Sequence, residues 1–262
     1  MVSAANPAIL AGPTPTRELF GIPIAALTLE QALDRVEHAI QARTRLQIGV
    51  VNAAKVVNMQ RDALLRDDVL SSDLILADGI AVVWASRVLG VALPERVPGI
   101  DLMTGILRRG AARGYRVFCL GATDDVLDKA AARMLADHPG VRIVGCQHGY
   151  FSADQEERVA RTIADARPDV LFVAMTSPKK EKFLARWSKE LGVPVCHGVG
   201  GSFDVLAGKV RRAPRLWQLL GLEWLYRVLQ EPGRLWKRYL VTNTLFCTML
   251  LRGLLQRARP GR

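Results

Sequence analysis

The pattern that decides the fold is clearest in residues 169–201, which read DVLFVAMTSPKKEKFLARWSKELGVPVCHGVGG. Residues 169–175 form an apolar run of strand length, residues 179–191 have helical spacing, and residues 193–197 form a second apolar run. Strands of Val, Leu and Ile that alternate with helices of about ten or more residues are typical of a parallel sheet covered by helices. This stretch therefore predicts an α/β fold.

The same alternation continues on the N-terminal side of this stretch. Apolar runs predict strands at residues 46–51, 74–77, 115–120 and 141–146. Helical spacing predicts helices at residues 53–66, 80–89, 101–113, 124–136 and 153–166. We expect a Rossmann-like, mostly parallel sheet over residues 17–207, preceded by a flexible tail at residues 1–16 that is rich in Ala and Pro.

Positive charge is concentrated at the C-terminal end of the chain. The formal net charge is +11, and residues 207–262 hold twelve Lys or Arg against two Glu, a net +10. Trp and Leu alternate there with Arg, which suits a membrane interface, although a helical cap with its Trp side chains in the core fits this composition equally well. We expect residues 208–262 to form a basic appendage of two or three amphipathic helices that associates with an anionic membrane surface.

Several classes of protein are disfavoured by the composition. Residues 1–16 lack the pattern of a signal peptide, and no run of about 18 apolar residues is present, which predicts a soluble or peripheral cytoplasmic protein. The four cysteines contain no CxxC pair, so neither a zinc site nor a disulfide framework is expected. Cys119, Cys146 and Cys196 lie in or beside apolar runs and are expected to be buried free thiols.

Polar residues and glycines follow the predicted strands, where open α/β sheets bind their ligands. Asp78 follows an apolar strand and precedes Gly79, so its carboxylate is a candidate general base. The alternative role for Asp78 is the N-cap of the next helix, and the two roles do not exclude each other. No DxD motif is present, so no acidic metal site is expected.

A second group of candidates suggests an anion site. The glycines of residues 198–201 resemble a phosphate-binding turn at a helix N-terminus, and the lysines at 179 and 180 add positive charge after the preceding strand. A solvated helix face is the alternative for these lysines. His148 and His197 lie near strand ends, where an ordinary hydrogen-bonded role is expected for each. The dinucleotide fingerprint GxGxxG is absent, which disfavours a nicotinamide-dependent oxidoreductase.

Taken together, these segments resemble the WecG/TagA/CpsF family of bacterial glycosyltransferases. The matching stretches read VNAAK (51–55), ADG (77–79), GID (99–101), LGA (120–122), SPKKE (177–181) and GVGGSFD (198–204), followed by RAP (212–214), GLEWLYR (221–227), EP (231–232) and RY (238–239). They occur in a consistent order over about residues 20–240. Within the family, the chain looks most like the glucosyltransferases of xanthan-type exopolysaccharide assembly.

The resemblance implies an inverting, metal-independent transfer without a cofactor. The donor would be a UDP-sugar and the acceptor a polyprenyl-diphosphate-linked sugar at the cytoplasmic face of the inner membrane, where the enzyme can form a homo-oligomer. It assigns the base to Asp78 and the orientation of acceptor or sugar to Asn52. The residues expected to bind substrate are Gly79, Gly121, Ala122, Lys180, Glu181, Gly200, Gly201, Asp204, Arg227, Arg234 and Arg238.

One position departs from the family pattern. Many members have Thr two residues before the Asn, and here that residue is Val50. The change favours a glucose donor, with an N-acetylmannosamine or N-acetylmannosaminuronic acid donor as the alternative. Two alternatives of another class are a non-catalytic membrane-binding protein and a nucleic-acid-binding protein. The Trp and Leu beside the arginines fit lipid better than a phosphate backbone, so no nucleic-acid partner is expected.

Overall fold

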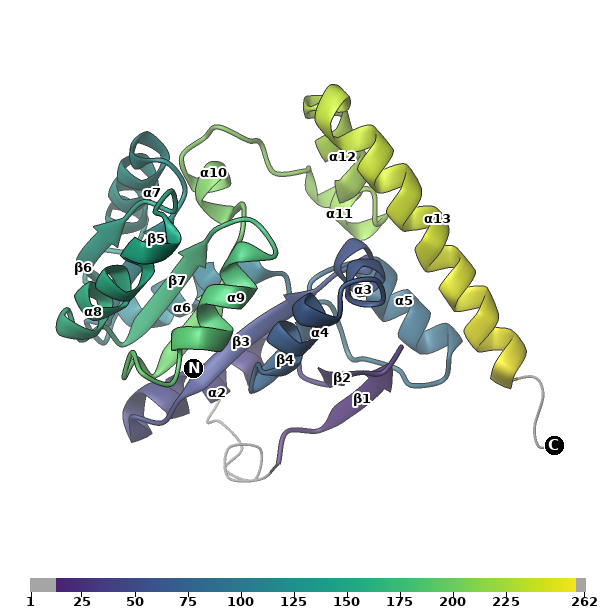
Figure 1. Cartoon of the computed structure of the whole chain (residues 1–262), viewed down its shortest axis with the longest axis horizontal. Coiled ribbons are helices and arrows are strands. Elements are labelled where there is room, and N and C mark those ends of the chain that lie inside the picture. Colours follow the sequence, from purple (N-terminus) through teal and green to yellow (C-terminus); the bar gives the residue numbers. More distant parts are fainter. Residues whose placement is uncertain (1–12, 258–262) are drawn as a thin grey trace.

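The computed structural model describes residues 13–257, which form an α/β fold around one six-stranded parallel sheet (Figure 1). The strand order is β4-β3-β8-β7-β5-β6, and every neighbouring pair in this sheet is parallel. The strands are β3 (Leu46–Val51), β4 (Leu74–Ala77), β5 (Arg116–Gly121), β6 (Arg142–Gln147), β7 (Val170–Ala174) and β8 (Val195–Gly198). The Rossmann-like fold expected from the sequence is confirmed.

Both faces of the sheet are apolar because side chains alternate along each strand. On β7, Val170 and Phe172 belong to one buried cluster, whereas Leu171 and Val173 belong to another. The first cluster includes side chains of α2 (Leu29–Ala42), α6 (Gly99–Ala111) and α7 (Asp124–Asp137). The second includes side chains of α8 (Glu156–Asp165), which follows the short helix η1 (Ala153–Gln155), and of α9 (Lys179–Trp187). Helices therefore cover both faces, as a parallel sheet requires.

A short hairpin precedes the sheet. Strands β1 (Thr16–Leu19) and β2 (Ile22–Ala25) pair antiparallel, and the turn between them places Phe20 and Gly21 at positive φ. The sequence pattern did not predict this hairpin because each strand is only four residues long. Thr16, the last residue of the expected tail, is the first residue of β1. Residues 1–12 of that tail lie outside the described residues.

The single helix expected at residues 53–66 is instead two helices, α3 (Ala53–Met59) and α4 (Ala63–Leu70). Asp62 causes the break because its carboxylate accepts a hydrogen bond from the backbone N–H of Leu65 and so caps the start of α4. The following helix, α5 (Ile80–Val88), matches the expectation within one residue.

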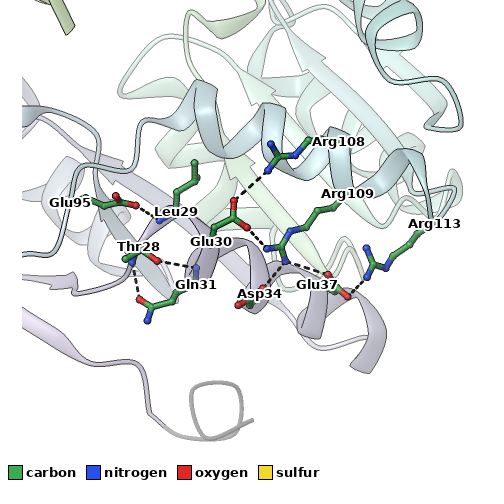
Figure 2. A network of polar contacts seen from close by, with 10 residues as sticks. All are labelled: Thr28, Leu29, Glu30, Gln31, Asp34, Glu37, Glu95, Arg108, Arg109 and Arg113. Atoms are coloured by element: carbon green, nitrogen blue, oxygen red, sulfur yellow. Dashed lines mark hydrogen bonds and ion pairs between the residues drawn. The ribbon is translucent and has the colours of Figure 1, made fainter. Parts of the chain in front are cut away.

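Helices α2 and α6 are joined by a network of ion pairs at the surface (Figure 2). Arg109 of α6 contacts Glu30, Asp34 and Glu37 of α2, and Arg113 contacts Glu37. The α2 helix starts at a capping box in which the Thr28 hydroxyl accepts from Gln31 N–H and the Gln31 side chain accepts from Thr28 N–H. Since α6 begins next to Asp78, this network fixes a helix that is part of the candidate site.

The C-terminal appendage consists of three helices, α11 (Arg215–Leu219), α12 (Glu223–Gln230) and α13 (Pro232–Arg257). Gly221, with φ of +71°, separates the first two helices. Helix α13 lies along α3, and Figure 1 shows it on the side of the molecule away from α7 and α8. Phe246 of α13 is buried in the cluster around α3. Its ring meets the Phe20 ring edge-to-face, with the ring centroids 5.6 Å apart. One side of the appendage is therefore part of the core.

Two of the three thiols expected to be buried are buried. Cys119 and Cys196 lie on the interior strands β5 and β8, but Cys146 is exposed, and that expectation was wrong. The reason is the position of β6, which is the edge strand of the sheet. An edge strand has a neighbour on one side only, and this arrangement is decided by strand order rather than by the local apolar run.

Candidate active site

Asp78, Gly79 and Asn52 meet at the carboxyl ends of β4 and β3. These strands are paired so that Val51 faces Ala77, and Asp78 N–H donates to the Val51 carbonyl at 2.9 Å. A Cβ placed on Gly79 would lie 3.2 Å from the Asn52 Cβ, so glycine allows the two loops to approach closely. The structure therefore brings together the carboxylate and the amide that the sequence singled out.

The Asp78 carboxylate caps a different helix from the one expected. The N-cap of α5 is Gly79, which makes no side-chain capping bond, so the expected capping of the next helix is wrong. Instead, Asp78 Oδ1 accepts a hydrogen bond of 2.9 Å from Gly99 N–H at the start of α6. Within residues 13–257, Oδ2 accepts no hydrogen bond and is available to a ligand.

The two polar atoms of the Asn52 side chain also have different roles, one within the protein and one open to a substrate. Its Oδ1 accepts from Lys55 N–H at 3.0 Å and caps α3. The side chain is exposed, so the Nδ2 amide can donate to a substrate oxygen beside Asp78.

His197 supports the segment that holds Asp78. The imidazole is fully buried, and Nε2 lies 3.1 Å from the Gly99 carbonyl oxygen. Burial lowers the pKa of His197, so the ring is neutral and donates through Nε2. A Cβ on Gly99 would lie 3.7 Å from the imidazole and 3.9 Å from Val50 Cγ1. Val50, which replaces the Thr found in many family members, therefore lies next to this supporting segment.

Gly121 and Ala122 form a tight turn at the end of β5. Both have positive φ, and a Cβ on Gly121 would lie 2.5 Å from the backbone of Ala174. Ala122 N–H donates to the Ala174 carbonyl, and its own carbonyl accepts from Gly149 N–H. Because the Ala122 N–H already donates to Ala174, Ala122 would contribute to ligand binding through the shape of the turn and not through its amide.

The glycine loop after β8 offers fewer amides than its sequence suggests. Gly200 N–H donates to the Val173 carbonyl at 3.3 Å, whereas Gly201 N–H has no partner within the described residues. The helix that follows, α10 (Ser202–Leu206), has only five residues. Asp204 in its first turn is half-buried and lies 3.5 Å from Lys209 Nζ.

Lys180 and Glu181 are buried together beneath these loops. Glu181 Oε1 lies 2.6 Å from Lys180 Nζ and 2.6 Å from the Nζ of Lys55 on α3. The sequence analysis did not single out Lys55 as a site residue, because its partner is far along the chain.

The appendage is attached to the first turn of α6 and to the loop that precedes this helix. Arg212 binds both carboxylate oxygens of Asp101, and Arg96 binds Glu223 and Gln218. Neither arginine was among the predicted site residues, although the RAP motif includes Arg212. Burial alone lowers the pKa of Arg212, but Asp101 raises it, and Asp78 contributes to the rise.

Two of the predicted appendage arginines are exposed. Arg227 lies on α12 and Arg238 on α13, where its guanidinium stacks on the Tyr239 ring. Neither forms an ion pair with the core in the described part of the chain. The side chain of Arg234 lies outside what is described.

Residues 13–257 contain neither a cluster suited to a metal ion nor a helix suited to span a membrane. No three His, Cys, Asp or Glu side chains come together there in a way that could hold a metal ion. No helix in this range combines the length and the apolar character needed to cross a bilayer.

Two known proteins with similar sequences carry the same enzyme name. An N-acetylglucosaminyldiphosphoundecaprenol N-acetyl-β-D-mannosaminyltransferase of Bacillus spizizenii W23 is 42% identical over 170 residues, which is 65% of each chain. A protein of the same name from Bacillus subtilis strain 168 is 35% identical over 236 residues, 90% of this chain and 91% of the relative. The model of the glycosyl transferase WecG/TagA/CpsF family matches residues 17–260. The chain therefore belongs to the WecG/TagA/CpsF family of glycosyltransferases.

Proposed function

We propose that this protein transfers N-acetylmannosamine from a UDP-sugar to N-acetylglucosamine linked to a polyprenyl diphosphate, at the cytoplasmic face of the membrane. The observation that carries the proposal is Asp78, whose carboxylate accepts a hydrogen bond from Gly99 at one oxygen and from none of residues 13–257 at the other. Both relatives carry the name of an N-acetylmannosaminyltransferase. Their names favour this donor over the glucose donor that the sequence analysis preferred.

Asp78 and Asn52 have different roles in the proposed reaction. Asp78 Oδ2 takes the proton of the acceptor hydroxyl, whose oxygen then attacks the anomeric carbon of the donor. The bond from that carbon to the UDP oxygen breaks, and a single displacement inverts the configuration. Asn52 Nδ2 donates to a sugar or acceptor oxygen and helps to hold it beside Asp78.

Donor comparison tests this function directly. Purified full-length protein is incubated with a lipid-diphosphate-linked N-acetylglucosamine and either UDP-N-acetylmannosamine or UDP-glucose, and the UDP released is measured. We expect release with UDP-N-acetylmannosamine that exceeds release with UDP-glucose at least tenfold. Faster release with UDP-glucose would restore the glucose donor, and no release with either would contradict the proposed reaction.

The outer side of the appendage supports membrane association. Trp236, Leu240, Leu251 and Leu255 of α13 are all exposed and lie on one side of the helix, at i, i+4, i+15 and i+19. Basic side chains adjoin them, among them the exposed Lys237, whose Nζ lies 5.5 Å from the centre of the Trp236 ring. An exposed apolar stripe with basic neighbours binds the headgroup region of an anionic bilayer.

Substitutions on this stripe predict a loss of vesicle binding. We expect Leu240→Glu combined with Leu251→Glu to lower binding to vesicles of anionic phospholipid at least tenfold, because apolar burial is lost and negative charge is added. Leu135→Glu, an exposed leucine on α7 of the core, is the matched control and should leave binding unchanged. Equal binding of the double variant and the wild type in a sedimentation assay would exclude this face of α13 as the contact.

A further inference from the structure

Three charged side chains are buried between α3 and α9. The side chains of Lys55, Lys180 and Glu181 are 10%, 9% and 7% exposed. Both ammonium groups lie 2.6 Å from the same oxygen, Glu181 Oε1. When all three are ionised, two cations share one anion, so the cluster carries a net charge of +1. Because burying an uncompensated charge is costly, this excess calls for an explanation in the site above it.

One oxygen of the cluster lacks a hydrogen-bond partner among residues 13–257. Glu181 Oε2 is buried and has no hydrogen-bond partner among the described residues. A cavity of about 20 Å³ adjoins it, with Gln47, Ser72 and Asp68 on its polar wall. A cavity of this size has room for one water molecule, and the polar groups on its wall can bind it.

The cluster connects two loops of the candidate active site. Lys55 holds Asn52 Oδ1 with its backbone N–H and Glu181 with its ammonium group. Strand β8 lies between β3 and β7 in the sheet, so the link from Asn52 to Glu181 passes beneath the glycine loop after β8. The stem of Lys180 passes close to Gly198, where a Cβ would lie 3.2 Å from Lys180 Cε. The Lys180 ammonium is therefore fixed below the loop that starts at Gly198.

The two charged neighbours of Lys180 shift its pKa in opposite directions. Burial and the neighbouring Lys55 lower the pKa of Lys180 to about 8, while Glu181 acts to raise it. Burial alone raises the pKa of Glu181, but Lys55 and Lys180 lower it to about 2. The other groups on this side are Asp68 of α4, which lines the cavity, and the neutral His197 of β8.

We propose that Lys55 and Glu181 are positioning residues that hold the Lys180 ammonium as the buried cation attracting the diphosphate of the donor. The inference rests on the proposed function, because it takes a nucleoside diphosphate sugar as the ligand. The excess positive charge of the cluster is then compensated when the donor binds. Glu181, predicted from the family resemblance to bind substrate, acts through Lys180 instead.

A consequence is that donor affinity depends on the charge of Lys180. Lys180 carries its proton below a pH of about 8 and loses it above, so affinity for UDP falls as the pH rises through this value. Removing the Lys55 charge takes away a repulsion and moves the fall to higher pH. Removing the Glu181 charge takes away an attraction and moves the fall to lower pH.

The experiment measures UDP affinity by calorimetry on the full-length protein from pH 6 to pH 9. We expect affinity to fall about tenfold across the wild-type transition, which corresponds to about 1.4 kcal/mol. Lys55→Met should move the midpoint up and Glu181→Gln should move it down. Lys180→Arg, which keeps its proton throughout, should bind UDP without the fall. Lys182→Met, an exposed lysine on the same helix, is the matched control and should keep the wild-type midpoint.

The outcomes separate the inference from the proposed function. Opposite movement of the two midpoints supports the inference, since a purely structural cluster would weaken binding without moving them in opposite directions. UDP binding with the same midpoint in all folded variants would overturn the inference and leave the donor class intact. Absence of UDP binding by the folded wild type at every pH would overturn the donor class, and the inference with it.

Discussion

Asp78→Asn should lower the turnover number by a factor on the order of 10² to 10⁴, because a positioned general base contributes about that much to a rate. The asparagine keeps an oxygen that can accept from Gly99 N–H, so the start of α6 should stay in place. What is lost is the ability to take a proton from the acceptor hydroxyl. Steady-state UDP release at saturating donor and acceptor measures the effect.

Two further measurements make this result interpretable. Calorimetric UDP affinity of Asp78→Asn should match the wild type, since the carboxylate acts on the acceptor side of the reaction. Asp137→Asn, at the exposed end of α7 beside Arg133, is a matched change far from the site and should keep full turnover. Near-normal turnover of Asp78→Asn would remove Asp78 as the base.

Phe246→Ala should lower the free energy of unfolding by about 3–5 kcal/mol. Phe246 is only 5% exposed and packs with Phe20 and the side chains around α3, so its removal leaves a cavity in a well-packed cluster. A loss of this size would mean that α13 folds as a part of the core. Chemical denaturation monitored by circular dichroism measures the change.

A substitution on the opposite side of the same helix is the control. Leu251→Ala, at a position 60% exposed, should change the free energy of unfolding by less than about 0.5 kcal/mol. If Phe246→Ala were equally mild, α13 would contribute little to stability, and the core and appendage would behave as separable units. This outcome would fit the domain boundary at residue 208 that the sequence predicts.

The comparison of these two residues shows why the charge count was an incomplete guide to the appendage. The count located the basic residues correctly, and the Trp and Leu content left a helical cap and a membrane surface equally open. In the structure, α13 has an apolar side that packs on the core and an exposed apolar side opposite to it: Phe246 lies inward and Leu251 outward. Which side faces the core depends on packing against α3, which composition does not record.

The sequence by itself determined the parallel sheet and the polar residues at its carboxyl edge. Buried strands must be apolar on both faces, and connecting helices need their own period, so local pattern was sufficient for β7, α9 and β8. Asp78 and Asn52 could be selected for a similar reason, since each polar side chain directly follows an apolar strand. The role of Asp78 as the base remains a prediction.

Tertiary structure alone decided how these residues are held. Asp78 is bound by Gly99, 21 residues away, and Gly99 by His197, 98 residues away. Lys55 meets Glu181 across 126 residues. These contacts form because parallel strands place distant loops at one edge of the sheet, and hydrogen bonds are short-ranged, so they depend on strand order and register. Neither strand order nor register is present in any local stretch of the chain.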